Sequence, residues 1–184
     1  MGKTSTQLPV KLFVGVLTSL PEITAEIQIR LSALFGPVDL GIGPLPFDST
    51  DYYNSEMGSP ISRFFFGFSE LIEPSTIAGI KIQTNKLETA FAAEQTAVSR
   101  PVNLDPGYLE QSKIVLASTK NYYHRILLSA GIYAEVTLHY EAGHWCIFPW
   151  TFPDFRTKRY HPFFSSLRKL YRDQLKAMGL VRTV

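Results

Sequence analysis

The stretch VKLFVGVLTSLPEITAEIQIRLSALFGP, residues 10–37, predicts a buried strand followed directly by a helix. Apolar side chains occupy nearly every position of Val10–Leu17, and β-branched residues lie among them, which is typical of a strand buried on both faces. Ser19 and Glu22 have the spacing of a capping box, and apolar residues then recur at helical intervals up to Gly36-Pro37. We therefore expect a central strand and a helix that packs against it.

The next segments extend this pattern. Residues 38–42 predict a short strand, and Ile61–Phe68 predicts a longer one with alternating faces. Pro74–Glu94 predicts a second helix, whose charged face includes Lys81 and is expected to be solvated. Between the two strands lies the long loop Phe47–Ser59. Loops of this length are usually functional or disordered, and the tyrosines and acidic residues in this one favour a function.

The second half of the chain predicts several strands and a closing helix. Lys113–Thr119 and Tyr122–Ser129 predict two strands joined by a tight turn, and Ile132–Tyr140 alternates between apolar and polar positions. Trp145–Phe148 predicts a short strand, and Pro162–Met178 an amphipathic helix. We expect an α+β fold: a mixed or mainly antiparallel sheet with about three helices largely on one face, and a ferredoxin-like first half.

Length and composition predict a single domain over residues 1–184. A formal net charge of +2 does not make the basic footprint of a DNA-binding protein, so no DNA partner is expected. The lone cysteine, Cys146, excludes an internal disulfide framework and a zinc site built from several thiolates. The amino-terminal apolar run of about eight residues is too short to span a membrane, which takes about 18 residues or more. We expect a cytoplasmic protein.

The motif NLDPGYL, residues 103–109, places a carboxylate between an asparagine and a Pro-Gly pair. These residues are typical of a turn, in which Asn103 and Asp105 bond their own backbone. Alternatively, the loop presents the same two side chains at the end of a strand, beside Arg100 and Lys113, where they could hold a cation or a hydroxylated ligand. The sequence does not separate these two interpretations.

A second candidate, Glu135, lies on the polar face of the predicted strand Ile132–Tyr140, beside Tyr133 and Thr137. If that face meets solvent, Glu135 is a surface residue. If the face lines a pocket under the long loop, Glu135 is a candidate general base or metal ligand. Residues four apart on one strand face lie about 13 Å apart, so Glu135 and His139 cannot bind one ion together.

The motif WTFPDFR, residues 150–156, combines aromatic rings with Asp154 and Arg156. In an extended chain these two residues would share a side. Alternating aromatic residues usually mean packing, so one interpretation is a segment that seals the sheet edge. The other is that Arg156, among aromatic rings, binds a planar anion or a phosphorylated base.

The chain resembles a bacterial domain-of-unknown-function family, number forty-four-sixteen. NLDPGYL and WTFPDFR are similar to the hallmark motifs of that family, and KIVLASTKN and GIYAEVTLHYEAGHW link them. The similarity also covers VKLFVGVL, the TDYYNSEMG loop and the TNKLE helix, so it runs nearly end to end. The family has no established activity, so the resemblance implies a single prokaryotic domain and no mechanism.

Two functional hypotheses remain open, and the sequence does not decide whether the protein is an enzyme. The first is a pocket that binds or processes a small phosphorylated or nucleotide-like ligand with a divalent metal ion. Its predicted catalytic residues, which are also the predicted metal ligands, are Asp105, Glu135 and Asp154. Its predicted ligand-binding residues are Asn103, Tyr108, Lys113, Thr137, Arg156 and Arg63. The alternative is a non-catalytic module that binds protein or RNA, or forms a homo-oligomer, through exposed aromatic residues.

Overall fold

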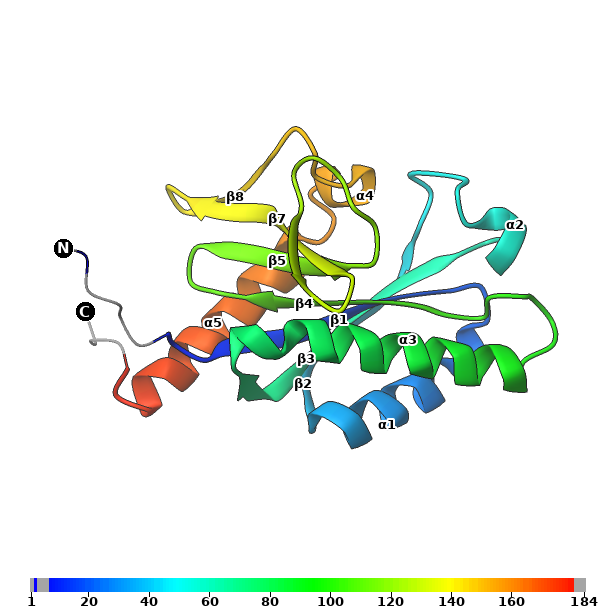
Figure 1. The fold of residues 1–184 in the computed structure, drawn as a ribbon, viewed down its shortest axis with the longest axis horizontal. Coiled ribbons are helices and arrows are strands. Elements are labelled where there is room, and N and C mark those ends of the chain that lie inside the picture. Colours follow the sequence, from blue (N-terminus) through cyan, green and yellow to red (C-terminus); the bar gives the residue numbers. More distant parts are fainter. Residues whose placement is uncertain (1, 3–6, 181–184) are drawn as a thin grey trace.

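The structure is a computed structural model that describes Gly2 and residues 7–180. Within this part of the chain, eight strands form one antiparallel sheet (Figure 1). The strands are β1 (Val10–Thr18), β2 (Val38–Pro46), β3 (Ser62–Ile72), β4 (Asn103–Leu109), β5 (Lys113–Ser118), β6 (Ile126–Ser129), β7 (Ile132–Glu141) and β8 (His144–Ile147). The helices are α1 (Thr24–Phe35), α2 (Asn54–Met57), α3 (Ile77–Glu94), α4 (Pro153–Arg156) and α5 (His161–Ala177), and 3-10 turns at Pro21–Ile23 and Pro74–Thr76 precede α1 and α3.

The first half of the chain has the expected ferredoxin-like arrangement. Its principal elements follow in the order β1-α1-β2-β3-α3-β4, and its strands lie in the order β2-β3-β1-β4, each antiparallel to its neighbours. Every residue of β1 is buried, which confirms the predicted central strand. β5, β7 and β6 continue the sheet beyond β4, and β8 pairs with the second half of β7. The predicted α+β class with a mainly antiparallel sheet is confirmed.

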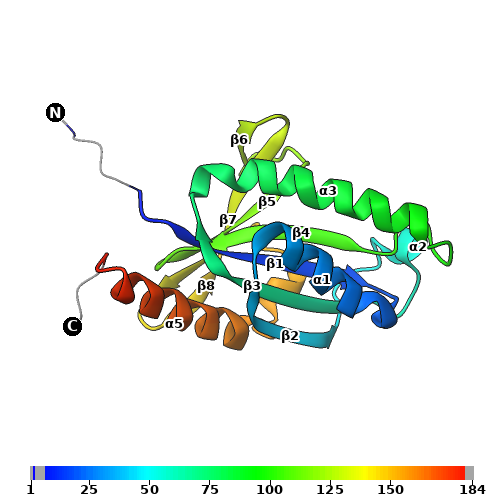
Figure 2. The ribbon, with the colours of Figure 1, turned by 90° about the horizontal axis from the view of Figure 1, so that it is seen from below.

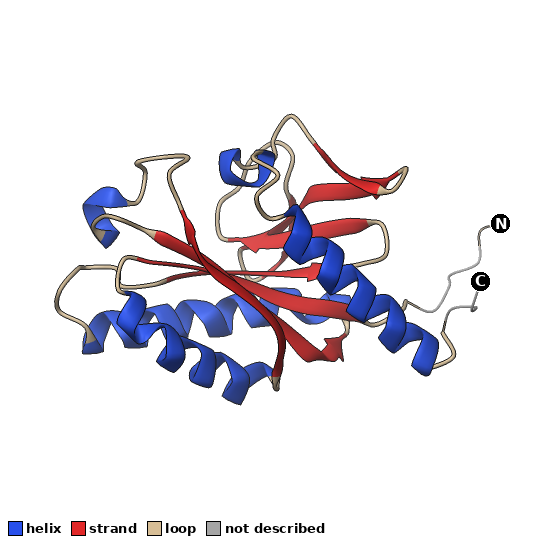
Figure 3. Ribbon diagram, turned by 180° about the vertical axis from the view of Figure 1, so that it is seen from behind, coloured by secondary structure: helices blue, strands red, loops and turns tan. Residues whose placement is uncertain are grey.

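Helices cover both faces of this sheet (Figures 2 and 3). α1 and α3 share one face, where an ion pair between Arg30 and Glu94 joins them and Phe66 lies in the core. α5 packs on the opposite face, against Phe13 and Phe65. Because neighbouring residues of β3 belong to different layers, its predicted alternation is confirmed. Full burial of one such side chain stabilises the fold by about 1.5–3 kcal/mol, so the two layers supply most of the driving force for folding.

The NLDPGYL motif is a strand, so the interpretations of it as a turn and as a loop are both wrong. β4 pairs with β1 along its whole length, and with β5 only from Gly107 onward. Pro106 has no N–H to donate, but it lies before the residues that pair with β5. The pairing of β4 with β5 therefore loses no backbone hydrogen bond at the proline. A Cβ atom on Gly107 would lie 2.5 Å from the Val115 carbonyl oxygen. The glycine permits close approach of two strands and does not serve a turn.

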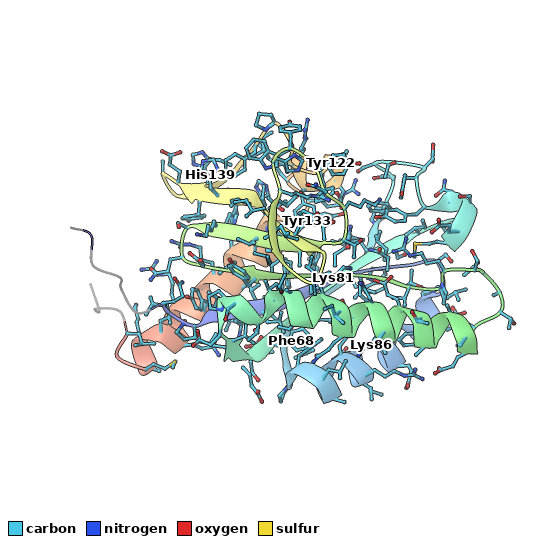
Figure 4. The ribbon with its side chains drawn as sticks, viewed as in Figure 1. Phe68, Lys81, Lys86, Tyr122, Tyr133 and His139 are labelled. Carbon is cyan, nitrogen blue, oxygen red and sulfur yellow. The ribbon has the colours of Figure 1, made fainter. Side chains whose placement is uncertain are left out.

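Two expectations about the helices are also wrong. No capping box forms before α1, because the Ser19 hydroxyl donates a hydrogen bond to the carbonyl oxygen of Met57 instead. Lys81, expected on a solvated face of α3, is buried, and its Nζ donates to the Leu104 carbonyl oxygen at 2.6 Å. Figure 4 labels Lys81 and, on the solvent side of α3, the exposed Lys86. Within the described residues, no helix is long and apolar enough to cross a membrane.

The segment after β5 differs from its predicted hairpin. β6 begins at Ile126, four residues later than expected, and it pairs with β7 instead of β5. The turn between β6 and β7 consists of Ala130 and Gly131, with φ angles of 50° and 74°. Tyr122–Arg125 therefore belongs to the segment that connects β5 with β6 and not to a strand.

Candidate functional site

A cavity of about 380 Å³ lies where the loop between β2 and β3 meets α3, β4, β5 and α4. This volume falls within the range of about 300–1,000 Å³ that is usual for small-molecule sites. Five of the lining residues are basic and four are acidic, a formal excess of one positive charge. The basic side chains are Arg63, Lys81, Arg100, Lys120 and Arg125; the acidic ones are Glu88, Asp105, Glu135 and Asp154; the aromatic ones are Phe47, Tyr52, Tyr53, Phe152 and Phe155.

The three carboxylates predicted as catalytic residues all line this cavity. Asp105 comes from β4, Glu135 from β7 and Asp154 from the first turn of α4. The fold thus gathers three acidic side chains that are far apart in the sequence, as the first hypothesis requires. Their catalytic and metal-binding roles stay predictions, because each of the three carboxylates is paired with an arginine.

Arg63 joins two of these carboxylates. Its Nη1 lies 3.2 Å from Asp105 Oδ2, and its Nη2 lies 3.0 Å from Asp154 Oδ2. Burial lowers the pKa of Arg63, but the carboxylates of Asp154 and Asp105 outweigh this effect and raise the pKa above its ordinary value. Tyr160, whose hydroxyl donates to Asp154 Oδ2 at 3.2 Å, completes the group. The guanidinium is therefore a permanent positive charge in the cavity wall.

Glu135 is buried, so its interpretation as a surface residue is wrong. Its Oε2 accepts hydrogen bonds from Arg125 Nε at 2.7 Å and pairs with His124 Nε2 at 3.0 Å. Its Oε1 accepts from the Thr137 hydroxyl at 3.1 Å. Both oxygens are thus engaged by side chains of the connecting segment and of β7, which makes Glu135 the anchor that positions Arg125 at the cavity.

Asp105 is the most accessible of the three carboxylates. Its side chain is 30% exposed, against 6% for Asp154 and 1% for Glu135. The hydrogen bonds from Arg63 Nη1 and Asn103 Nδ2 both go to Oδ2. Among the residues that the structure describes, Oδ1 of Asp105 has no partner, so this oxygen is available to a ligand or a cation.

One wall of the cavity comes from α3 and Arg100. Glu88 accepts hydrogen bonds from the Leu104 amide at 2.8 Å and from Arg100 Nη2 at 3.2 Å, and it lies 3.7 Å from Lys81 Nζ. Burial raises the pKa of Glu88, against the opposing effect of Lys81. Burial, followed by the charge of Asp105, raises the pKa of Tyr53 to about 12, so this phenol stays neutral and able to donate.

The mouth of the cavity is bridged by two exposed side chains. Lys120 Nζ donates to the Tyr52 hydroxyl at 2.9 Å and lies 4.4 Å from the centre of the same ring. Tyr52 belongs to the loop between β2 and β3, and Lys120 follows β5. An exposed cation–π contact contributes only about 0.5–1 kcal/mol, so a ligand can displace it at low cost.

The six predicted ligand-binding residues divide into two groups. Arg63 and Asn103 line the cavity, whereas the other four are not among its lining residues. Lys113 pairs with Glu110 at 3.3 Å, Tyr108 packs partly buried against the core, and Thr137 reaches the site only through Glu135.

Arg156 departs furthest from expectation. Pro153 begins the helical turn α4, so Asp154 and Arg156 do not share a side as they would in an extended chain. The Arg156 Nε donates to the Thr151 carbonyl oxygen at 2.6 Å.

The sequence-based prediction omits four charged residues of the lining: Lys81, Glu88, Lys120 and Arg125. Lys81 and Glu88 are seven residues apart on α3, so they lie on one helix face two turns apart. That spacing, beside the buried Thr84, is a signal that could have identified them. No periodic pattern marks Lys120 and Arg125, because both lie outside regular structure.

Comparison with known proteins places the chain in one family. A family model described as "Domain of unknown function (DUF4416)" matches residues 8–171. The chain belongs to the DUF4416 family. All residues that line the cavity fall within the matched range, so the candidate site is part of the DUF4416 domain itself. No curated protein and no solved structure matches the chain.

Proposed function

We propose that the cavity binds a small phosphorylated, nucleotide-like ligand. One observation carries this proposal: five basic side chains and five aromatic rings line a single cavity of about 380 Å³. Guanidinium groups suit phosphate oxygens because their donors form a rigid fork, and aromatic rings suit the flat face of a base.

The phosphate end of the ligand is best placed near Lys120, Arg100 and Arg125. Among the described residues, the Lys120 ammonium has a hydrogen bond only to Tyr52, and the Arg100 side chain is 31% exposed. Arg125 Nη1 donates to Ser118 Oγ at 2.8 Å and to the Lys120 carbonyl oxygen, which draws the segment around Lys120 over the cavity. Burial lowers the pKa of Arg100, but Glu88 and further neighbours raise it above its ordinary value, so its charge is constant at neutral pH.

A divalent cation fits this site at Asp105. Magnesium is usually bound through one or two carboxylates together with phosphate oxygens of the substrate. Asp105 Oδ1 is available for such a contact, whereas both oxygens of Glu135 are engaged. A cation there would polarise a bound phosphate, so hydrolysis or transfer of a phosphoryl group is the reaction that the arrangement suits best.

Thermal unfolding in the presence of nucleotides tests this proposal. We expect at least one nucleoside phosphate, offered at millimolar concentration with and without magnesium, to raise the melting temperature. A ligand at 100 times its dissociation constant stabilises by about 2.7 kcal/mol, which corresponds to roughly 5–11 °C for a domain of this size. The variants Lys120→Ala and Asp105→Asn should lose most of this shift, and Asp105→Asn should also remove its dependence on magnesium.

Lys86→Ala is the matched control, because Lys86 is an exposed lysine that does not line the cavity. This variant should respond to the ligand as the unmodified protein does. A melting temperature that no nucleotide and no divalent ion changes would contradict the proposal. An equal shift in the Lys120→Ala and Lys86→Ala variants would place the binding site elsewhere.

A specific surface favours self-association as a second function. Ile126, Leu127 and Leu128 of β6 are 73%, 57% and 43% exposed, and the neighbouring Tyr123 is 87% exposed. β6 ends the strand order of the sheet, so its outer edge carries unpaired backbone groups. Two antiparallel copies of one edge strand are complementary to each other about a two-fold axis. We infer that β6 pairs with β6 of a second copy.

Light scattering after size exclusion tests this inference. The unmodified protein should elute as a dimer, and Leu127→Lys should shift it to a monomer because a buried lysine has no partner in the interface. Ile29→Lys is the matched control, since Ile29 is 63% exposed on α1, which packs against β3 near the opposite end of the sheet from β6. A monomeric protein at high micromolar concentration would rule the inference out.

A further inference from the structure

The hairpin of β7 and β8 carries four side chains of metal-ligand type on one face. Its sequence is HYEAGHWC, residues 139–146. His139 is directly opposite Cys146, and Glu141 is directly opposite His144. Opposed residues of an antiparallel pair share a face, as do residues two apart on one strand. The four side chains therefore emerge on the same side of the hairpin, and Figure 4 shows His139 at that edge of the molecule.

The other face of the hairpin fixes it to the core. Tyr140 and Trp145 lie opposite each other, with ring centres 5.0 Å apart, and Trp145 is only 4% exposed. Trp145 Nε1 donates to Ser165 Oγ of α5 at 3.2 Å. Between the strands, Ala142 and Gly143 form a two-residue turn with φ angles of 47° and 86°. The packing of Trp145 and the tight turn thus fix the backbone that presents the four side chains.

The potential ligand atoms already lie close together. One nitrogen of His139, one oxygen of Glu141 and the sulfur of Cys146 all lie within 4.8 Å of one another. His139 Nε2 is 3.3 Å from Glu141 Oε2. Tetrahedral zinc, with bonds of about 2.0–2.3 Å, sets its ligand atoms about 3.3–3.8 Å apart. Small side-chain rotations would therefore complete such a site without movement of either strand.

Within the described chain, one ring nitrogen of His139 lacks a polar partner, while the other, Nε2, faces Glu141. Its Nδ1 is buried and has no hydrogen-bond partner among the described residues. The ring of Phe148 packs against it, with ring centres 4.8 Å apart, and so limits its rotation. A metal ion at one ring nitrogen would therefore bind an imidazole whose orientation Phe148 already limits.

We propose that His139, Glu141 and Cys146 form a binding site for Zn²⁺ or a similar transition-metal ion. A thiolate and an imidazole select ions of this class over magnesium and calcium, which prefer oxygen ligands alone. Three protein ligands leave a fourth position, which His144 or a water molecule fills. His144 is exposed, and within the described part of the chain its ring has one hydrogen-bond partner, the Ala142 carbonyl oxygen at 3.2 Å from Nδ1, so the ring can turn.

This site is independent of the nucleotide-like ligand proposed above. Glu135 and His139 are four residues apart on β7, about 13 Å, so one ion cannot join the cavity to the hairpin. The two sites also differ in ligand chemistry: the hairpin offers sulfur and nitrogen beside one carboxylate, whereas the predicted metal ligands of the cavity are carboxylates alone. Failure of either proposal would leave the other unaffected.

Titration with Co²⁺ under reducing conditions, followed by optical absorption, tests the site. We expect a thiolate-to-cobalt charge-transfer band, together with the intense visible bands of tetrahedral cobalt, and loss of both when Zn²⁺ is added. Because Cys146 is the single cysteine of the chain, Cys146→Ser must abolish the charge-transfer band. His139→Ala and Glu141→Gln should each weaken binding by at least 10–100-fold, the approximate loss seen even when a group around the ligands is changed.

Glu141 is 73% exposed, so Glu141→Gln cannot fail merely because the protein unfolds. Glu73→Gln and His161→Gln are matched controls and should leave cobalt affinity unchanged. His144→Ala either weakens binding, which identifies the fourth ligand, or leaves it unchanged, which places water there; both results support the site. A missing charge-transfer band in the unmodified protein, or equal affinity in the Glu141→Gln and Glu73→Gln variants, would overturn the proposal.

Discussion

Replacing Arg63 by alanine is expected to lower the free energy of unfolding by about 3–5 kcal/mol. Arg63 is 4% exposed and holds Asp105 and Asp154 together, so its loss leaves the buried Asp154 without its counter-charge. An uncompensated buried charge is among the most destabilising single changes in a protein. Urea denaturation at neutral pH measures the effect through the midpoint of the transition.

Arg159→Ala is the matched control, because the Arg159–Asp48 pair is largely exposed and exposed ion pairs contribute little to stability. Equal costs for Arg63→Ala and Arg159→Ala would show that the buried group does not support the fold as described.

Gly107→Ala is expected to destabilise the protein by about 1–3 kcal/mol, the usual range for overpacking. The new Cβ would lie 2.5 Å from the Val115 carbonyl oxygen and 2.7 Å from Phe13 Cζ, and the first of these is backbone that cannot move without opening the pairing of β4 with β5. The substitution should also disturb the candidate site, because Asp105 lies two residues away on the same strand. Thermal unfolding measures the loss of stability.

A second glycine serves as the control for this substitution. Gly79 lies inside α3, and a Cβ atom there would meet nothing within 4 Å. Gly79→Ala should therefore stabilise the protein by about 0.5–1 kcal/mol through helix propensity. We expect the free energy of unfolding to fall for Gly107→Ala and to rise for Gly79→Ala. A fall for Gly79→Ala with no change for Gly107→Ala would contradict the argument.

The first half of the fold was predictable because its signals are periodic. β1 is apolar at nearly every position and is buried on both faces, and the alternation of β3 follows directly from its phenylalanines. Gly36, with a φ of 87°, ends α1 where the sequence indicates. Signals of this kind depend only on residues that are close together in the sequence, so they can be identified without knowledge of the tertiary fold.

The NLDPGYL motif is a strand and not the predicted turn, because the constraint that decides its structure is not local. Proline and glycine together usually mark a turn, and here the glycine accommodates Val115 and Phe13, which are remote in the sequence. β6 begins later than predicted for a similar reason, since its partner is the following strand, β7, to which the turn Ala130-Gly131 joins it.

The candidate site could be predicted only in part. Asp105, Glu135 and Asp154 stood out because each is a carboxylate within an apolar or aromatic stretch, and all three line the cavity. The sequence does not predict which arginine pairs with which carboxylate. The ion pair between Arg63 and Asp154, for example, depends on the position of α4 relative to β3 in the fold. Arg125 lies within the segment predicted as a strand, so no sequence pattern indicates its ion pair with Glu135.

The cavity lies across the seam between the ferredoxin-like half and the strands that extend it. Arg63, Lys81 and Asp105 belong to the first part, and Glu135 and Asp154 to the second. A fragment cut after β4 would carry only one side of the pocket. Transplanting the ferredoxin-like half alone into another protein would therefore leave the cavity incomplete.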